Sequence, residues 1–140
     1  MDNNLSFFSK DLLNNKSVGQ ELSLESIAGK LTYFHEQLHL LHWQTQSFAE
    51  HKALGSLYEY IQDFKDDVIE KLMGYTNKRP GVYKIEPLTS ATPMAVVSEI
   101  LAFATQLKSF AEKNMYHDIC NLADSFSGEA AKTKYLLTLS

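Results

Sequence analysis

The sequence predicts an all-α domain, folded as an antiparallel four-helix bundle with one long connection between its second and third helices. Apolar residues recur at steps of three and four along four separate segments, which is the pattern of bundle helices. The prolines, at 80, 87 and 93, fall in one short region, so they interrupt this pattern only once. The few β-branched runs also favour helix over sheet.

The chain of 140 residues fits one domain and is long enough to bury a core without disulfide bonds. We predict an N-terminal arm or short helix over residues 1–22 and the bundle over residues 23–140. The arm carries apolar side chains that would let it dock as a short helix, and a loose arm is equally compatible with its polar composition. These side chains are Leu5, Phe7, Phe8, Leu12 and Leu13.

Sequence signals place the ends of the four helices. Ser23 or Ser26 can cap the first helix, and Thr92 followed by Pro93 is a typical helix start. Gly128, inside the fourth helix, can mark a close contact with a neighbouring helix. The predicted helices lie near 23–47, 51–75, 93–113 and 117–138, with a short turn around 47–51 that makes the first two antiparallel neighbours.

Charge and composition exclude several classes of function. The chain has 17 acidic and 13 basic residues, and Lys78-Arg79 is its only basic pair, so DNA binding is not expected. The arm adds only Lys10 and Lys16. No apolar run approaches the roughly 18 residues of a membrane span, so no membrane partner is expected. The single cysteine, Cys120, and the absence of a basic start followed by an apolar run favour a reducing, cytoplasmic location.

The chemistry is concentrated in residues 34–74. On a helical wheel His35, His39 and His42 lie beside the apolar stripe of the first predicted helix. Four carboxylates gather on the side of the second helix that is opposite its apolar stripe. Imidazole and carboxylate together suit iron, zinc or manganese. Packed histidines and a solvated acidic face remain the alternative interpretation. The four carboxylates are Glu59, Asp63, Asp66 and Glu70.

Glu36 and His39 form a Glu-x-x-His pair, the spacing that di-iron carboxylate bundles use. A complete site of that kind within one chain needs a second pair. The fourth helix offers only Glu129-Ala-Ala-Lys132, so we reject an intrachain di-iron oxygenase. Glu36, His39 and Asp63 remain secondary candidates for metal binding.

A more specific pattern is the His42-Trp43 pair followed by Phe48, His51, Asp66 and Glu70. It resembles the Dps-type mini-ferritins of the ferritin-like superfamily, over roughly residues 24–139. The resemblance implies a ferritin-like bundle that forms at least a homodimer and binds iron, with zinc or manganese as alternatives. It also implies that His42 and His51 of one subunit and Asp66 and Glu70 of its two-fold mate hold the metal, with Trp43 packed over the site. The implied activity is ferrous iron oxidation, the ferroxidase step of iron storage.

The sequence also departs from that family. His42 and His51 are closer together than the family places its two histidines, and Gly55 stands where the family usually has an aspartate. These departures favour a second hypothesis, a non-enzymatic dimeric helical bundle. Such a structural or adaptor protein would have kept the ferritin-like frame and lost the metal chemistry.

Overall fold

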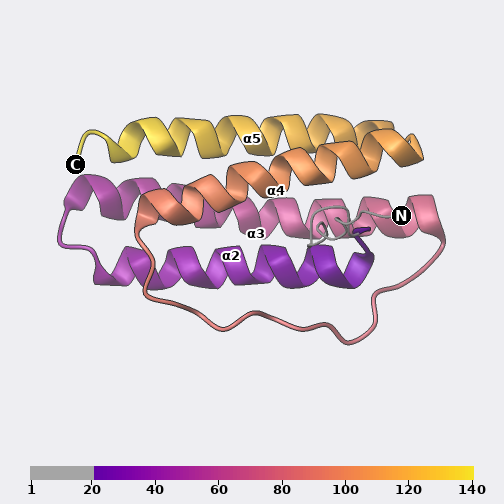
Figure 1. Ribbon diagram of the computed structural model, residues 1–140, viewed down its shortest axis with the longest axis horizontal. Helices are drawn as coiled ribbons and strands as arrows, with labels where there is room; N and C mark the ends of the chain where they lie inside the picture. Colours follow the sequence, from indigo (N-terminus) through magenta and orange to yellow (C-terminus); the bar gives the residue numbers. More distant parts are fainter. Residues whose placement is uncertain (1–20) are drawn as a thin grey trace, which may run out of the picture.

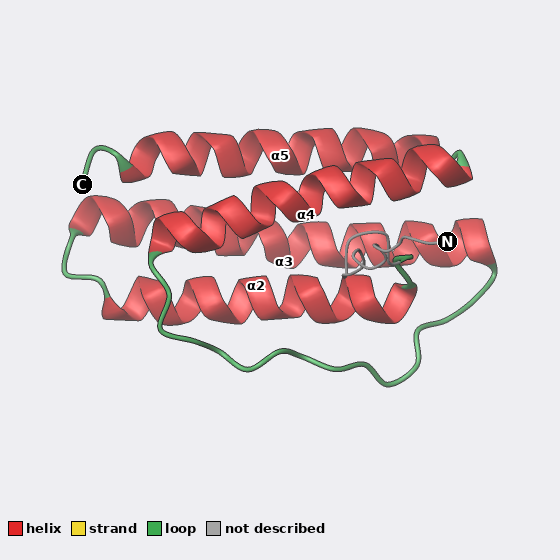
Figure 2. Cartoon of the chain, in the orientation of Figure 1, coloured by secondary structure: helices red, strands yellow, loops and turns green. Residues whose placement is uncertain are grey.

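The computed structural model describes residues 21–140, which form four long helices and, within that range, no strand (Figure 2). The predictions for the arm, including its apolar side chains and two lysines, lie almost entirely outside the described residues. For the described part, the prediction of an all-helical domain with four long helices is confirmed. The helices are α2 (Leu24–Gln44), α3 (Phe48–Thr76), α4 (Pro93–Asn114) and α5 (His117–Leu137).

Figure 1 shows α2 and α3 side by side and running in opposite directions, with α4 and α5 paired in the same way. The segment 77–92 returns along the length of α2, so α4 begins at the end of the molecule where α2 ends. The helices share one apolar core, in which Phe34, Ile61, Ile100 and Phe126 are completely buried. Burial of this core is the main force that holds the four helices together.

The helix starts follow the predicted capping signals. Ser23 is the N-cap of α2, and it forms a capping box with Ser26 in which each hydroxyl accepts a hydrogen bond from the other residue's backbone N–H. Thr92 caps α4 and Pro93 occupies its first turn. Asn77, in the left-handed conformation with φ of 57°, ends α3.

The turn between α2 and α3 lies earlier than predicted. Helix α2 ends at Gln44 and α3 begins at Phe48, so the turn occupies residues 45–47 instead of 47–51. The Ser47 hydroxyl accepts a hydrogen bond from the Glu50 N–H at 3.2 Å, and the Thr45 hydroxyl donates to the Glu50 carboxylate at 2.6 Å. The serine cap therefore starts the helix before His51, which lies within the first turn of α3.

Two further predictions are wrong. Gly128 marks no close helix contact, because a Cβ built there meets nothing within 4 Å. The apolar pattern of the second predicted helix extends to Tyr75 and so places this residue in the core, but Tyr75 is 42% exposed. Its hydroxyl accepts a hydrogen bond from the Asp118 N–H at 3.2 Å, which supplies a cap for α5, whose N-cap residue Tyr116 makes no side-chain cap bond. Lys71 lies 2.5 Å from Asp118, and this contact raises the pKa of Lys71.

The segment 77–92 is fastened to α2 by side chains of that helix. The completely buried Gln37 amide donates to the Thr89 carbonyl at 3.0 Å and accepts from the Thr89 N–H at 2.9 Å. Near the other end, the Glu25 carboxylate accepts from the Gly81 N–H at 2.7 Å, which lowers the pKa of Glu25. Because the segment 77–92 is not helical, its backbone N–H and carbonyl groups lack helix hydrogen bonds, and these side chains of α2 supply partners for three of them.

Among the described helices, α4 has the length and apolar composition that a membrane span also has. Length and composition do not separate a membrane span from the core helix of a bundle. Here Val97, Ile100 and Leu107 of α4 are completely buried against the other helices. We therefore describe α4 as a core helix.

Gly29 allows the segment 77–92 to approach α2, and this generates a stability prediction. A Cβ at Gly29 would collide with the backbone carbonyl oxygen of Lys84, which cannot move like a side chain. We expect Gly29→Ala to lower the free energy of unfolding by about 1–3 kcal/mol, the usual cost of overpacking. Gly128→Ala is the control, because an unobstructed helical glycine gains up to about 1 kcal/mol on this change. Urea denaturation measures both, and a Gly29 variant as stable as the control would contradict this role.

Candidate metal centre

Histidine and aromatic side chains gather where α2 meets α3. We call them the histidine cluster, and its members are His35, His39, His42, Trp43, Phe48, His51 and Tyr58. Ring centroids lie 3.7 Å apart for His42 and His51, 4.1 Å for His39 and Trp43, and 4.5 Å for His39 and Tyr58. Trp43 is 67% exposed and Phe48 is 75% exposed, whereas the histidines are half-buried. The predicted position of His35, His39 and His42, at the border between core and surface, is confirmed.

The central pair of the cluster is joined by two reciprocal hydrogen bonds. His42 Nδ1 donates to the His51 carbonyl at 2.8 Å, and His51 Nδ1 donates to the His42 carbonyl at 3.0 Å. A carbonyl oxygen only accepts, so both neutral rings carry their proton on Nδ1 and have a lone pair on Nε2. No other described residue hydrogen-bonds to either Nε2. Histidines that bind metals are oriented in this way, with one ring nitrogen donating to the protein and the other facing the ion.

Gly55 provides the space for the His42 ring. A Cβ built at Gly55 would lie 3.1 Å from Cε1 and 3.3 Å from Nδ1 of His42. One turn further along α3, the Tyr58 ring meets the His42 ring edge-on, with centroids 5.2 Å apart. The sequence interpretation missed Tyr58 and treated Gly55 only as a departure from the resembled family. The steps of four and three from His51 to Gly55 and Tyr58 place all three on one helical face, which was the available signal.

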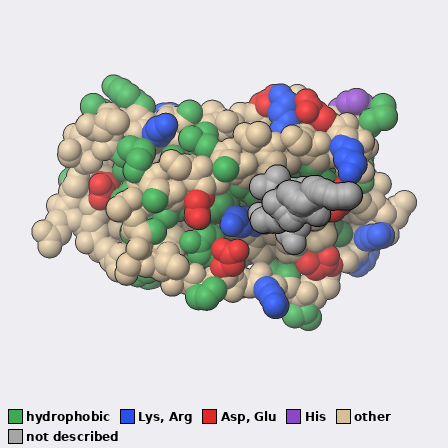
Figure 3. All heavy atoms as spheres, viewed as in Figure 1, with side chains coloured by type: hydrophobic (Ala, Val, Ile, Leu, Met, Phe, Trp, Pro, Cys, Tyr) green, Lys and Arg blue, Asp and Glu red, His purple; other side chains and the backbone are tan. Residues whose placement is uncertain are grey.

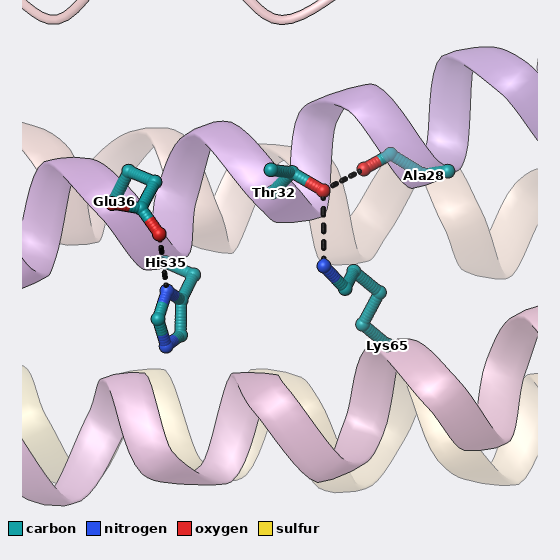
Figure 4. A network of polar contacts seen from close by, with 5 residues as sticks. All are labelled: Ala28, Thr32, His35, Glu36 and Lys65. Atoms are coloured by element: carbon teal, nitrogen blue, oxygen red, sulfur yellow. Dashed lines mark hydrogen bonds and ion pairs between the residues drawn. The ribbon is translucent and has the colours of Figure 1, made fainter. Parts of the chain in front are cut away.

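His35 is held differently from the central pair. Its Nδ1 lies 3.1 Å from the carboxylate of Glu36, as Figure 4 shows. Its Nε2 is buried and has no hydrogen-bond partner among the described residues. Beside it, Lys65 of α3 donates to the Thr32 hydroxyl of α2 at 3.1 Å, which links the two helices. Glu36, a secondary candidate for metal binding, therefore contacts the His35 ring. The ring of His39, another secondary candidate, lies between the rings of Trp43 and Tyr58.

The carboxylates of α3 form a separate group. Glu59, Asp63, Asp66 and Glu70 are all exposed, as predicted for the outer side of this helix. Asp66 follows His51 by fifteen residues on the same helix, which is about 22 Å at 1.5 Å per residue. One chain therefore does not bring His51 and Asp66 to the same ion. Within residues 21–140, no group of three or more His, Cys, Asp or Glu side chains is placed to hold a metal.

Charged side chains on the face drawn in Figure 3 are interspersed, with acidic and basic groups adjacent to one another. Ion pairs among the described residues include Lys108 with Asp124 at 2.8 Å and Lys30 with Glu86 at 3.7 Å. The visible part of this face therefore presents no continuous basic surface.

Over residues 21–140, the fold and the cluster define an all-helical, four-helix domain with paired histidines at the junction of α2 and α3. The chain belongs to a family described as a family of unknown function (DUF5856), whose match extends over residues 42–137. That range includes His42, His51, Asp66 and Glu70, whereas His35 and His39 precede it. The chain is also similar to the "Uncharacterized 14.6 kDa protein in mobD-ri intergenic region" of Enterobacteria phage T4, with 27% identity over 123 residues, covering 86% of this chain and 92% of the phage protein. No solved structure matches the chain.

The reciprocal hydrogen bonds predict the tautomers of two histidines. When their rings are neutral, His42 and His51 carry the ring proton on Nδ1, although free histidine prefers to carry it on Nε2. Long-range ¹H–¹⁵N NMR correlations distinguish the two forms, and His117, which is exposed in the first turn of α5, is the reference ring. Protonation of Nε2 in either neutral ring would contradict the hydrogen-bond assignment.

Proposed function

We propose that this protein is a mini-ferritin-like metal-binding protein that binds ferrous iron between two copies of the chain. His42 and His51 of one copy and Asp66 and Glu70 of the second copy are the proposed ligands. The observation that carries the proposal is the reciprocal pair of hydrogen bonds, which leaves Nε2 of both rings free to bind a metal. Iron is the first candidate, and zinc and manganese also accept this mixture of imidazole and carboxylate.

A two-fold arrangement of α3 would bring the proposed ligands together. Two copies of α3 that cross in opposite directions near Tyr58 and Glu59 would place His51 of one copy near Asp66 of the other, because these two positions are equally far from the crossing point. The same relation places Glu70 opposite Ser47, the residue before Phe48. Two sites related by the two-fold axis would result, one for each chain.

Exposed side chains support an interface at this position. Trp43 and Phe48 are large, exposed aromatic residues that flank the histidines, and aromatic residues are enriched in interface cores. Four carboxylates along one side of α3 repel one another, and a cation or a second copy would relieve that repulsion. We therefore propose a homo-oligomer of at least two copies. The paired helix directions and the long connection over 77–92 support a ferritin-like frame, which we also include in the proposal.

The proposed chemistry is oxidation of ferrous iron, the substrate. Each ferrous ion loses one electron, and two ions together supply the two electrons that, with two protons, reduce one dioxygen to hydrogen peroxide or one hydrogen peroxide to two waters. The residues of this chain would bind and orient the ion. The backbone carbonyls hold the imidazole rings through Nδ1, and the two rings, stacked 3.7 Å apart with planes 20° from parallel, would turn so that both Nε2 lone pairs meet one ion. The carboxylates of Asp66 and Glu70 favour the product, because a ferric ion has a higher positive charge than a ferrous ion.

Iron oxidation gives a direct test. Wild-type protein mixed with ferrous iron in air is expected to produce ferric absorbance faster than buffer, and Asp66→Ala combined with Glu70→Ala is expected to remove the difference. Glu99→Ala combined with Glu112→Ala is the matched control, since it removes the same charge from exposed positions of α4. A wild-type rate equal to that of buffer, or an equal loss in the control variant, would contradict the proposal.

Gly55 favours the second candidate function, a dimeric structural or adaptor bundle without metal chemistry. It supplies no ligand at the position of α3 that faces His42. The two functions differ in metal content. Both proposals predict a dimer when the mass of the protein in solution is measured. Protein purified without a chelator would contain bound metal under the first proposal and no metal under the second.

A further inference from the structure

An open groove runs beside the first two turns of α2, between α4 and the segment 77–92, which lie on either side of that helix in Figure 1. Its volume is about 1020 Å³, at the upper end of the range for small-molecule pockets. Leu22, Val82 and Phe103 contribute apolar surface from its different sides, and Val82 is completely exposed. The groove lies along the start of α2 and the histidine cluster lies at its end, so the two are separate.

The acidic side chains of the groove already have partners. The Glu86 carboxylate lies 3.7 Å from Lys30 Nζ, which also lies 5.3 Å from the centre of the Phe34 ring. The Glu25 carboxylate accepts a hydrogen bond from the Gly81 N–H at 2.7 Å. A cationic ligand would have to break these contacts, whereas apolar side chains can cover the apolar surface of the groove without breaking them. The groove therefore fits an apolar occupant.

The chain enters the bundle at one end of this groove. Leu22 and Ser23 line the groove, and just before them the Lys113 ammonium of α4 donates to the Glu21 carboxylate at 3.1 Å. Residues 14–20, which precede this point, can span about 23 Å when extended. The groove follows α2 only as far as Lys30, about 10 Å from Ser23 at 1.5 Å per residue. A segment that precedes residue 14 can therefore reach the whole groove.

Residues 5–13 have the sequence pattern of a helix that binds by one face. At about 100° per residue, Leu5, Phe8 and Leu12 fall within about 60° of one another on a helical wheel, and Phe7 falls on the other side. Anchors at steps of three and four are the pattern with which an amphipathic helix binds in a hydrophobic groove. This pattern matches an apolar groove that lies within reach.

We propose that residues 5–13 bind as a helix in the groove of their own chain, with Leu5, Phe8 and Leu12 against its apolar surface. A short link gives this segment an effective concentration on the order of millimolar at the groove, which favours it over the same segment of another copy. The bound segment connects α4 with the segment 77–92. This inference goes beyond the proposed function and does not depend on it, because the histidine cluster lies at the other end of α2.

Thiol labelling of a groove residue tests the inference in the full chain. Thr105 of α4 is exposed and lines the groove, so Thr105→Cys, combined with Cys120→Ser to remove the native thiol, provides the reporter. Phe8→Ser is expected to raise the rate of labelling by a bulky maleimide about tenfold or more, the factor that corresponds to the loss of one buried phenylalanine. Circular dichroism checks that the bundle stays folded.

Phe7→Ser is the matched control, because it removes the same side chain from the other face of the proposed helix. It is expected to leave the labelling rate unchanged. Equal labelling rates with and without Phe8→Ser would overturn the binding of the segment, and equal acceleration by both substitutions would overturn the proposed face. Protection by the same chain does not depend on protein concentration, so protection that disappears on dilution would assign the groove to another copy and overturn the inference.

Discussion

The two hydrogen bonds that join the rings and carbonyls of His42 and His51 connect the end of α2 to the start of α3 across the turn at 45–47. They give the His42 carbonyl, in the last turn of α2, a partner from across the turn, and they fix which nitrogen of each ring is free. The stacking of the two rings at 3.7 Å depends on the same bonds. A structural contact between two helices is thus also what prepares the imidazoles for a ligand.

Glycine has a similar double role at two positions of the fold. Gly29 lets the carbonyl of Lys84 approach α2, so the segment 77–92 can lie against that helix. Gly55 lets the His42 ring lie against α3. In both places the close approach depends on the missing Cβ, whereas the glycines at 74 and 128 have no neighbour that a Cβ would reach. The two crowded glycines position the parts of α2 that face the connecting segment and the histidine cluster.

The sequence predicted the helices well because their stripes and caps are local properties. Ile27, Phe34 and Leu38 repeat with the helical period, and Thr92-Pro93 is a start signal that needs no tertiary information. The turn at 45–47 was misplaced because Ser47 and Glu50 together decide where α3 begins. Tyr58 and the double hydrogen bond of Gln37 were missed, since both depend on which segment lies opposite. The histidines were identified by composition and position, but their tautomers and their reciprocal bonds depend on tertiary contacts that no single-helix pattern contains.

The central claim is that one metal centre is built from two copies of the chain, with His42 and His51 from one and Asp66 and Glu70 from the other. Anomalous X-ray diffraction from crystals loaded with Zn²⁺ tests it most directly, because it locates the ion and its ligands together. The account predicts an anomalous peak at bonding distance, about 2.0–2.2 Å, from both Nε2 atoms and from carboxylate oxygens of the second copy. A peak bound only by residues of one chain, or no peak at the histidine pair in a correctly folded crystal, would contradict it.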